Sequence, residues 1–159
     1  MMKALDLGCG YEKDRQLPGA DLCNSNLGWD EVELETGQRF FPHFASTGEP
    51  LPVPNGEYDL VWYSFGLYSC DFMSRKAIAD EITRITKPRA TLVIRDYTQW
   101  YIGGDIVNVP YIEWVKNIEE IFPGWHVDSV YVYVNENGQP EDIDSGALGV
   151  AAFLTKGWG

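Results

Sequence analysis

The stretch Leu5-Asp6-Leu7-Gly8-Cys9-Gly10 lies almost at the amino terminus and decides the fold class. Its apolar residues predict a short buried strand, and its two glycines predict a tight turn directly after that strand. Glycine adopts positive φ at little cost and has no Cβ, so a ligand can lie against the backbone there. In a parallel α/β sheet, such a turn lies at the carboxyl end of a strand, where ligands bind. Taken alone, this motif is weak evidence for a ligand site, because many Gly-x-Gly turns have only a structural role.

Size and composition favour a single domain over residues 1–159. A chain of this length buries a substantial core, and 45% hydrophobic residues argue against disorder. Only 12 basic residues face 24 acidic ones, which disfavours nucleic acid as a partner because phosphates are neutralised by Lys and Arg. No apolar stretch is long enough for a membrane span, and Cys9, Cys23 and Cys70 lack the spacing of a metal site. We therefore expect an acidic cytoplasmic protein without a membrane or metal partner.

The patterns along the chain alternate between strands and helices, which predicts an α/β fold. A second strand is expected near residues 21–23, after a connection of residues 11–20 that is too short for a full crossover helix. The first helix must therefore be shortened. Further helices are expected before Pro88 and over residues 111–122. Further strands are expected over 58–63, 90–95, 127–134 and 147–155, the last two antiparallel across the turn-rich loop 135–146.

Residues 24–57 form the least regular part of the sequence. Residues 31–35 alternate between acidic and apolar side chains and predict a short strand. Beyond them, Phe40, Phe41 and Phe44 lie among prolines and glycines. Such a loop is typical of either a lid over a pocket or a plug packed on the core, and buried aromatic residues are the commoner case.

Taken together, these motifs resemble the class I S-adenosylmethionine-dependent methyltransferases in their compact form. The family opens with an acidic-x-Gly-x-Gly turn, matched here by Asp6, Gly8 and Gly10. A characteristic segment leads into the family's fourth strand. It is similar here to Leu51-Pro52-Val53-Pro54-Asn55-Gly56-Glu57-Tyr58-Asp59-Leu60-Val61. The resemblance implies a Rossmann-like methyltransferase fold with a mostly parallel central sheet, a shortened first helix and a C-terminal antiparallel hairpin. The family's usual Gly-Gly after Lys-Pro is Arg89-Ala90 here, so that turn must take another shape.

The resemblance also implies S-adenosyl-L-methionine as the cofactor. Asp21, at the end of the second strand, would accept both ribose hydroxyls, and Glu35 would lie near the adenine. Because Gly8 has no side chain, the turn there would let the methionine portion of the cofactor lie close to the backbone. The full set of implied cofactor residues is Asp6, Gly8, Cys9, Gly10, Asp21, Leu22, Glu35, Ser64 and Phe65. From the residues alone, Asp21 also fits a turn, Glu35 fits a surface charge and Cys9 fits a small packing residue.

Residues that meet the methyl acceptor are expected after the fourth and fifth strands. Methyl transfer needs alignment, exclusion of water and in some enzymes a base. Tyr97 or Asp96 is the candidate base, and Trp100 and Tyr101 can stack on a flat acceptor; packing roles are the alternative for all of them. The positions after the fourth strand read Tyr63-Ser64-Phe65-Gly66, which is unlike the Asn-Pro-Pro-Tyr motif of enzymes that methylate amino groups of DNA bases.

Two functions of different classes follow from these patterns. The first is a methyltransferase acting on a small molecule or a protein side chain. The alternative is a non-catalytic module that binds S-adenosylmethionine or keeps only the fold. Nicotinamide-dependent oxidoreduction is disfavoured because Gly-x-Gly-x-x-Gly spacing is absent. If Asp21 holds the ribose, Asp21→Ala should weaken cofactor binding by about 1–3 kcal/mol. The acceptor and the oligomeric state are left open.

Overall fold

The computed structural model describes residues 2–8, 19–24, 32–42, 49–64, 66–68, 70, 72–133 and 147–158. Within these residues, seven strands form one sheet in the order β3-β2-β1-β4-β5-β9-β8. The strands are β1 (Ala4–Leu7), β2 (Asp21–Cys23), β3 (Phe40–Phe41), β4 (Tyr58–Ser64), β5 (Thr86–Tyr97), β8 (Trp125–Val132) and β9 (Gly149–Lys156). The helices are α1 (Phe72–Ile85) and α2 (Tyr111–Ile121), and β6 (Gln99–Ile102) pairs with β7 (Asp105–Asn108) in a separate hairpin.

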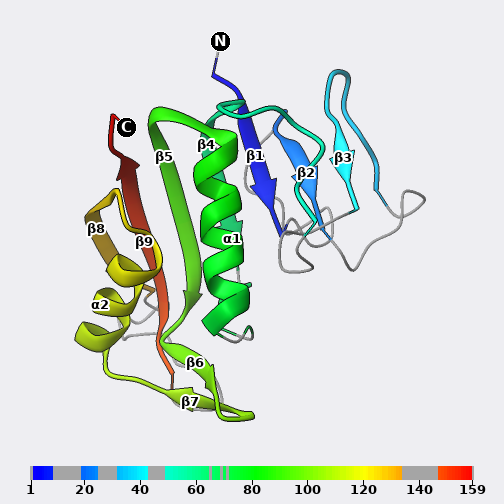
Figure 1. The fold of residues 1–159 in the computed structure, drawn as a ribbon. Coiled ribbons are helices and arrows are strands. Elements are labelled where there is room, and N and C mark those ends of the chain that lie inside the picture. The colour runs from blue at the N-terminus through cyan, green and yellow to red at the C-terminus, as the bar shows by residue number, and fades with distance from the viewer. Residues whose placement is uncertain are drawn as a thin grey trace.

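The predicted α/β architecture is confirmed. Strands β1 to β5 run parallel, whereas β9 runs antiparallel to both β5 and β8. From β1 the chain builds outward through β2 and β3, then returns to add β4 on the other side of β1. The order of the strands therefore reverses between β1 and β4, and ligands bind at the carboxyl side of such a switch point. Figure 1 shows β1, β2, β3 and β5 ending at the same edge of the sheet.

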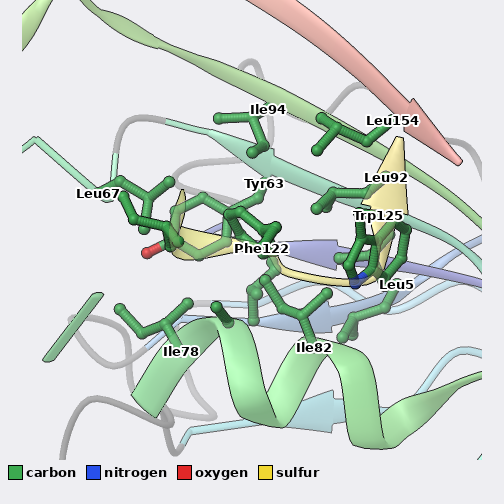
Figure 2. Close-up of a cluster of buried hydrophobic side chains, with 14 of the residues drawn as sticks. Leu5, Tyr63, Leu67, Ile78, Ile82, Leu92, Ile94, Phe122, Trp125 and Leu154 are labelled. Atoms are coloured by element: carbon green, nitrogen blue, oxygen red, sulfur yellow. The ribbon is translucent and has the colours of Figure 1, made fainter. Parts of the chain in front are cut away.

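One continuous core joins both helices to the sheet. Ile78, Ile82 and Ile85 follow each other along one side of α1 and are fully or almost fully buried in that core. Figure 2 shows Ile78 and Ile82 pointing from the helix toward Leu5 and Tyr63 of the sheet. Helix α2 adds Trp114, Ile118 and Ile121 to the same core. No helix of the described residues is long and apolar enough to cross a lipid bilayer.

The third strand lies later in the chain than the alternation of residues 31–35 predicted. Residues 32–35 are not a strand, and Leu34 is 43% exposed. Instead, Phe40 and Phe41 form β3 and pair with Leu22 and Cys23 of β2. Both phenylalanines are buried, which supports packing in the core over a lid; Phe44 lies outside the described residues. An alternating pattern buries only one face, whereas this position in the sheet needs an apolar side chain on each face.

The Lys-Pro-Arg-Ala segment is part of β5, which starts at Thr86 and so begins earlier than predicted. The pairing between β4 and β5 shifts register between Tyr58 and Leu60, so this first part of β5 is irregular. Arg89 has a φ of 66°, and it is the one non-glycine residue with positive φ among the described residues. Arg89, which stands where the resemblance implied a glycine, thus adopts a left-handed backbone conformation that favours glycine. Its guanidinium carbon lies 4.9 Å from the centre of the Trp158 ring.

We predict that Arg89→Gly unfolds at a higher urea concentration than Arg89→Ala. Both variants lose the contact with Trp158, but only glycine adopts the left-handed backbone conformation without strain. The free energies of unfolding of the two variants should therefore differ by about 1 kcal/mol. Urea denaturation followed by circular dichroism measures the two free energies of unfolding. Equal midpoints for the two variants would show that the φ of Arg89 carries no strain.

Candidate functional site

The predicted turn after β1 lies at the switch point of the sheet. Gly8 has a φ of 77°, and its N–H donates to the Cys23 carbonyl at 2.8 Å. A Cβ at Gly8 would lie 3.0 Å from the Ser64 carbonyl oxygen. The turn is thus held between the carboxyl ends of β2 and β4, with no room for a side chain on that side. Glycine is required here both by the backbone angle and by the close approach of β4.

The segment after β4 is packed just as closely. A Cβ at Gly66 would lie 2.2 Å from the Tyr63 phenol oxygen, so the Tyr63 ring occupies the place of a side chain. Leu67 is fully buried in the core, and the Cys70 thiol donates to the Gly66 carbonyl at 3.1 Å. These contacts fix the described part of the rim that follows Ser64.

Asp21 does not lie where the resemblance implied. It is the first residue of β2 and pairs with Leu5 of β1, so it stands at the amino end of the strand, away from the Gly8 turn. Its carboxylate accepts hydrogen bonds from the Arg39 guanidinium at 2.7 and 3.0 Å and from the Tyr58 hydroxyl at 2.8 Å. The Arg39 backbone N–H donates to its other oxygen at 3.0 Å. The expected position at the end of the second strand is therefore wrong, and the contacts of Asp21 are structural.

Glu35 also lies away from the position that the resemblance implied. Glu35 precedes β3, and its carboxylate accepts the Gly19 N–H at 3.0 Å, at the edge of the sheet where β2 begins. Leu22 is fully buried and packs with Phe40 and Val32 in a small apolar cluster. The spacing of acidic residues along the sequence did not reveal that a short β2 starts, rather than ends, at Asp21.

Of the remaining cofactor candidates, Asp6 and Ser64 lie at or near the carboxyl edge. Asp6 occupies the strand position between Leu5 and Leu7 and is almost fully buried. Because side chains alternate along a strand, it lies on the face opposite the core cluster that contains those two leucines. Ser64 is the last residue of β4. Cys9, Gly10 and Phe65 lie outside the described residues.

The two candidate bases have different surroundings. Tyr97 ends β5, is half-buried and packs edge-to-face on Tyr68, with the ring centres 5.3 Å apart. Asp96 is fully buried, and its carboxylate accepts the N–H groups of Leu67 at 3.1 Å and Tyr97 at 2.8 Å. Burial raises the pKa of Asp96 to about 7, against the lowering effect of these backbone donors. Because both carboxylate oxygens accept backbone N–H groups in the core, this geometry favours an anchoring role for Asp96 over that of a base.

The raised pKa of Asp96 predicts a dependence of stability on pH. Between pH 4 and 7 the folded carboxyl keeps its proton while the unfolded one, near its ordinary pKa of 3.8, releases it. Its stabilising contribution is complete below pH 4 and is lost as the pH rises through 7, a change of roughly 4 kcal/mol. Asp96→Asn has no such proton, so we expect the wild type to lose stability relative to this variant from pH 4 to 8. Urea unfolding of both proteins across that range measures the difference; parallel pH profiles would contradict the prediction.

Trp100 is part of the core, which corrects its expected role against the acceptor. It is 2% exposed, and its ring stacks on Trp114 at 6.2 Å between centres. The β6–β7 hairpin was not predicted from the sequence, and it lies at the edge of the sheet where β5 ends (Figure 1). It exposes a set of large apolar side chains: Tyr101, Ile102, Ile106 and Val107.

Comparison with protein-family models and with curated proteins finds no match for this sequence. The structure, however, is similar to many solved structures. A SAM-dependent methyltransferase from Methanosarcina mazei superposes with a TM-score of 0.67, at 16% identity, over 99% of this chain and 93% of its own. The chain has the fold of the SAM-dependent methyltransferases.

Other proteins of this methyltransferase fold differ in their reactions. The 1,6-didemethyltoxoflavin-N1-methyltransferase of Burkholderia thailandensis, solved with 1,6-didemethyltoxoflavin and S-adenosylhomocysteine bound, has a TM-score of 0.67 and 11% identity, covering 98% of this chain and 71% of its own. The [4+2]-cyclase SpnF has a TM-score of 0.67 and 15% identity, covering 99% of this chain and 75% of its own. At these identities the likeness establishes the fold, while the reaction must be argued from the site.

Proposed function

We propose that this chain is an S-adenosylmethionine-dependent methyltransferase of one domain, acting on a small molecule or a protein side chain. The observation that carries the proposal is the Gly8 turn. It combines positive φ, a backbone hydrogen bond to β2 and a 3.0 Å approach to Ser64 at the switch point of a methyltransferase fold. A glycine turn that is fixed between β2 and β4 and carries no side chain fits a ligand that lies directly against the main chain.

The residues proposed to hold the cofactor come from three neighbouring strand ends. Gly8, with Cys9 and Gly10 after it in the sequence, would line the methionine portion, and the carboxylate of Asp6 would help to hold its amino group. Ser64, the last residue of β4, would border it, with Phe65 after it in the sequence. With Asp21 bound to Arg39 and Tyr58 at the opposite edge, a ribose partner is better sought at the carboxyl end of β2. Asn24 follows β2 there, and an amide can bond two hydroxyls.

The acceptor side is proposed to be formed after β5 and along the β6–β7 hairpin. Tyr97, at the end of β5, is the candidate for removing a proton from the acceptor. The hairpin exposes apolar rather than basic side chains, and the whole chain carries a formal net charge of −12. Both features suit a small molecule or a protein surface and disfavour a polyanionic acceptor.

The chemistry demands little of the protein beyond placement. The bound cofactor supplies a methyl group on a positively charged sulfur, which needs no further activation. This chain would orient the two reactants in line and exclude water from the crevice. A large catalytic constellation is therefore not required for activity.

Calorimetric titration with S-adenosylmethionine and S-adenosylhomocysteine tests the proposed site directly. We expect saturable binding of both compounds by the wild-type protein. Transfer of a labelled methyl group to a panel of small-molecule and protein acceptors then tests turnover. A protein that binds neither compound at millimolar concentration would overturn the proposal, leaving only the fold.

A second candidate is a non-catalytic module that binds S-adenosylmethionine or keeps only the fold. The similarity to a [4+2]-cyclase bears on this candidate only in that the same fold is found in a protein named for a reaction other than methyl transfer, so the fold by itself does not require methyl transfer. Tight binding without transfer to any acceptor of the panel would favour this module over the enzyme.

A further inference from the structure

The turn at residues 66–68 links β4 to α1 and borders the proposed transfer site. It begins two residues after Ser64, whose carbonyl approaches the Gly8 turn. Its middle residue, Leu67, places its side chain in the core, while Tyr68 packs on Tyr97 at 5.3 Å between ring centres. A displacement of this turn would therefore move both the rim beside Gly8 and the aromatic pair on the acceptor side.

Asp96 holds this turn from the neighbouring strand. Its Oδ2 accepts the Leu67 N–H at 3.1 Å, its Oδ1 accepts the Tyr97 N–H at 2.8 Å, and the Tyr68 N–H also bonds to the carboxylate. The sequence separation between Leu67 and Asp96 is 29 residues, so the contact joins two distant parts of the chain. Among the described residues, these partners are backbone N–H groups, and no cation compensates the buried carboxylate.

A carboxyl group at this position is costly to bury. Transfer of a carboxylate from water into the core carries a large desolvation penalty, and an apolar side chain would avoid it. A carboxyl group is nevertheless present here because it accepts hydrogen bonds from three backbone N–H groups. The Leu67 N–H would be left without this acceptor if Asp96 were removed, and Leu67 is fully buried.

We propose that Asp96 is a positioning residue of the transfer site, whose carboxylate fixes the turn at residues 66–68 and thereby the Tyr68 ring beside Tyr97. This inference rests on the proposed function, since it assigns Asp96 a part in forming the cofactor and acceptor rim. It replaces the role of general base expected from the sequence: Asp96 acts through the backbone of the turn and does not touch the acceptor.

The test combines amide hydrogen exchange with S-adenosylhomocysteine binding in three variants. Asp96→Ala removes every acceptor, Asp96→Asn keeps one oxygen, and Leu92→Ala truncates a fully buried neighbour on the same strand. In Asp96→Ala we expect the amides of Leu67 and Tyr68 to exchange at least about tenfold faster relative to the amides of β1. We expect its affinity for S-adenosylhomocysteine to fall about tenfold or more. Asp96→Asn should recover part of both losses.

Leu92→Ala is the control for general destabilisation. It should lower the urea midpoint of unfolding, because it leaves a cavity in the core, without selective exchange at Leu67 and Tyr68. Its affinity for S-adenosylhomocysteine should stay within about twofold of the wild type. The proposal is overturned if Asp96→Ala speeds exchange only in step with global unfolding, or if it loosens the turn while affinity stays unchanged. A wild-type protein that does not bind S-adenosylhomocysteine would instead overturn the proposed function, and the exchange data would still decide whether Asp96 anchors the turn.

Discussion

Replacing Gly8 by alanine is expected to abolish cofactor binding and to destabilise the fold by about 2 kcal/mol or more. A φ of 77° is strained for alanine, and the added Cβ would meet the Ser64 carbonyl oxygen at 3.0 Å. That oxygen belongs to β4, which is paired with β1 and β5 and cannot move aside. The turn must therefore open, and the surface proposed to receive the methionine portion is lost. Calorimetry with S-adenosylhomocysteine and urea denaturation measure the two effects.

Gly19→Ala is a matched control for this experiment. Gly19 has the same φ of 77°, yet a Cβ there would meet nothing within 4 Å. It lies before β2, at the edge of the sheet away from the proposed site. This variant should carry the backbone cost of about 1–2 kcal/mol and keep the affinity for S-adenosylhomocysteine. Equal loss of affinity in both variants would show that the Gly8 turn has no special part in binding.

Asp21→Ala is expected to lower the free energy of unfolding by roughly 2–3 kcal/mol, a value reduced from that of a fully buried pair because Arg39 is partly exposed. The change removes the acceptor of the fully buried Tyr58 hydroxyl and of the Arg39 guanidinium. The affinity of the folded protein for S-adenosylhomocysteine should stay within about twofold of the wild type. This outcome differs from the weakened binding that the sequence alone predicted. Urea denaturation and calorimetry on the folded variant distinguish the two.

A double-mutant cycle with Arg39→Gln identifies the source of that loss. If Asp21 and Arg39 act as one pair, the two substitutions together should cost clearly less than the sum of each alone. Additive losses of unfolding free energy would show that the two side chains stabilise the fold independently. A loss of affinity of about tenfold in a folded Asp21→Ala protein would restore Asp21 as the ribose ligand.

The sequence determined the architecture because its signals are local. Positions spaced for a helix, such as Ile78, Ile82 and Ile85, and the apolar run through Leu92 predicted α1 and the core of β5. The Gly8 turn was likewise predicted, because two glycines directly after a short apolar run favour a tight turn at the end of a strand. The closing hairpin of β8 and β9 followed from two strands separated by a turn-rich loop. Each of these features needs only residues that are neighbours in the chain.

Tertiary structure decided which end of the sheet each acidic residue occupies. Asp21 and Glu35 matched a motif by order along the chain, but a strand as short as β2 gives no sequence signal for whether an acid starts or ends it. Only the pairing of Asp21 with Leu5, and the approach of Arg39 and Tyr58, place it at the amino edge. The burial of Asp96 depends in the same way on a turn 29 residues earlier in the chain. Local spacing thus determined the strands and helices, whereas the roles of the carboxylates were set by contacts between residues far apart in sequence.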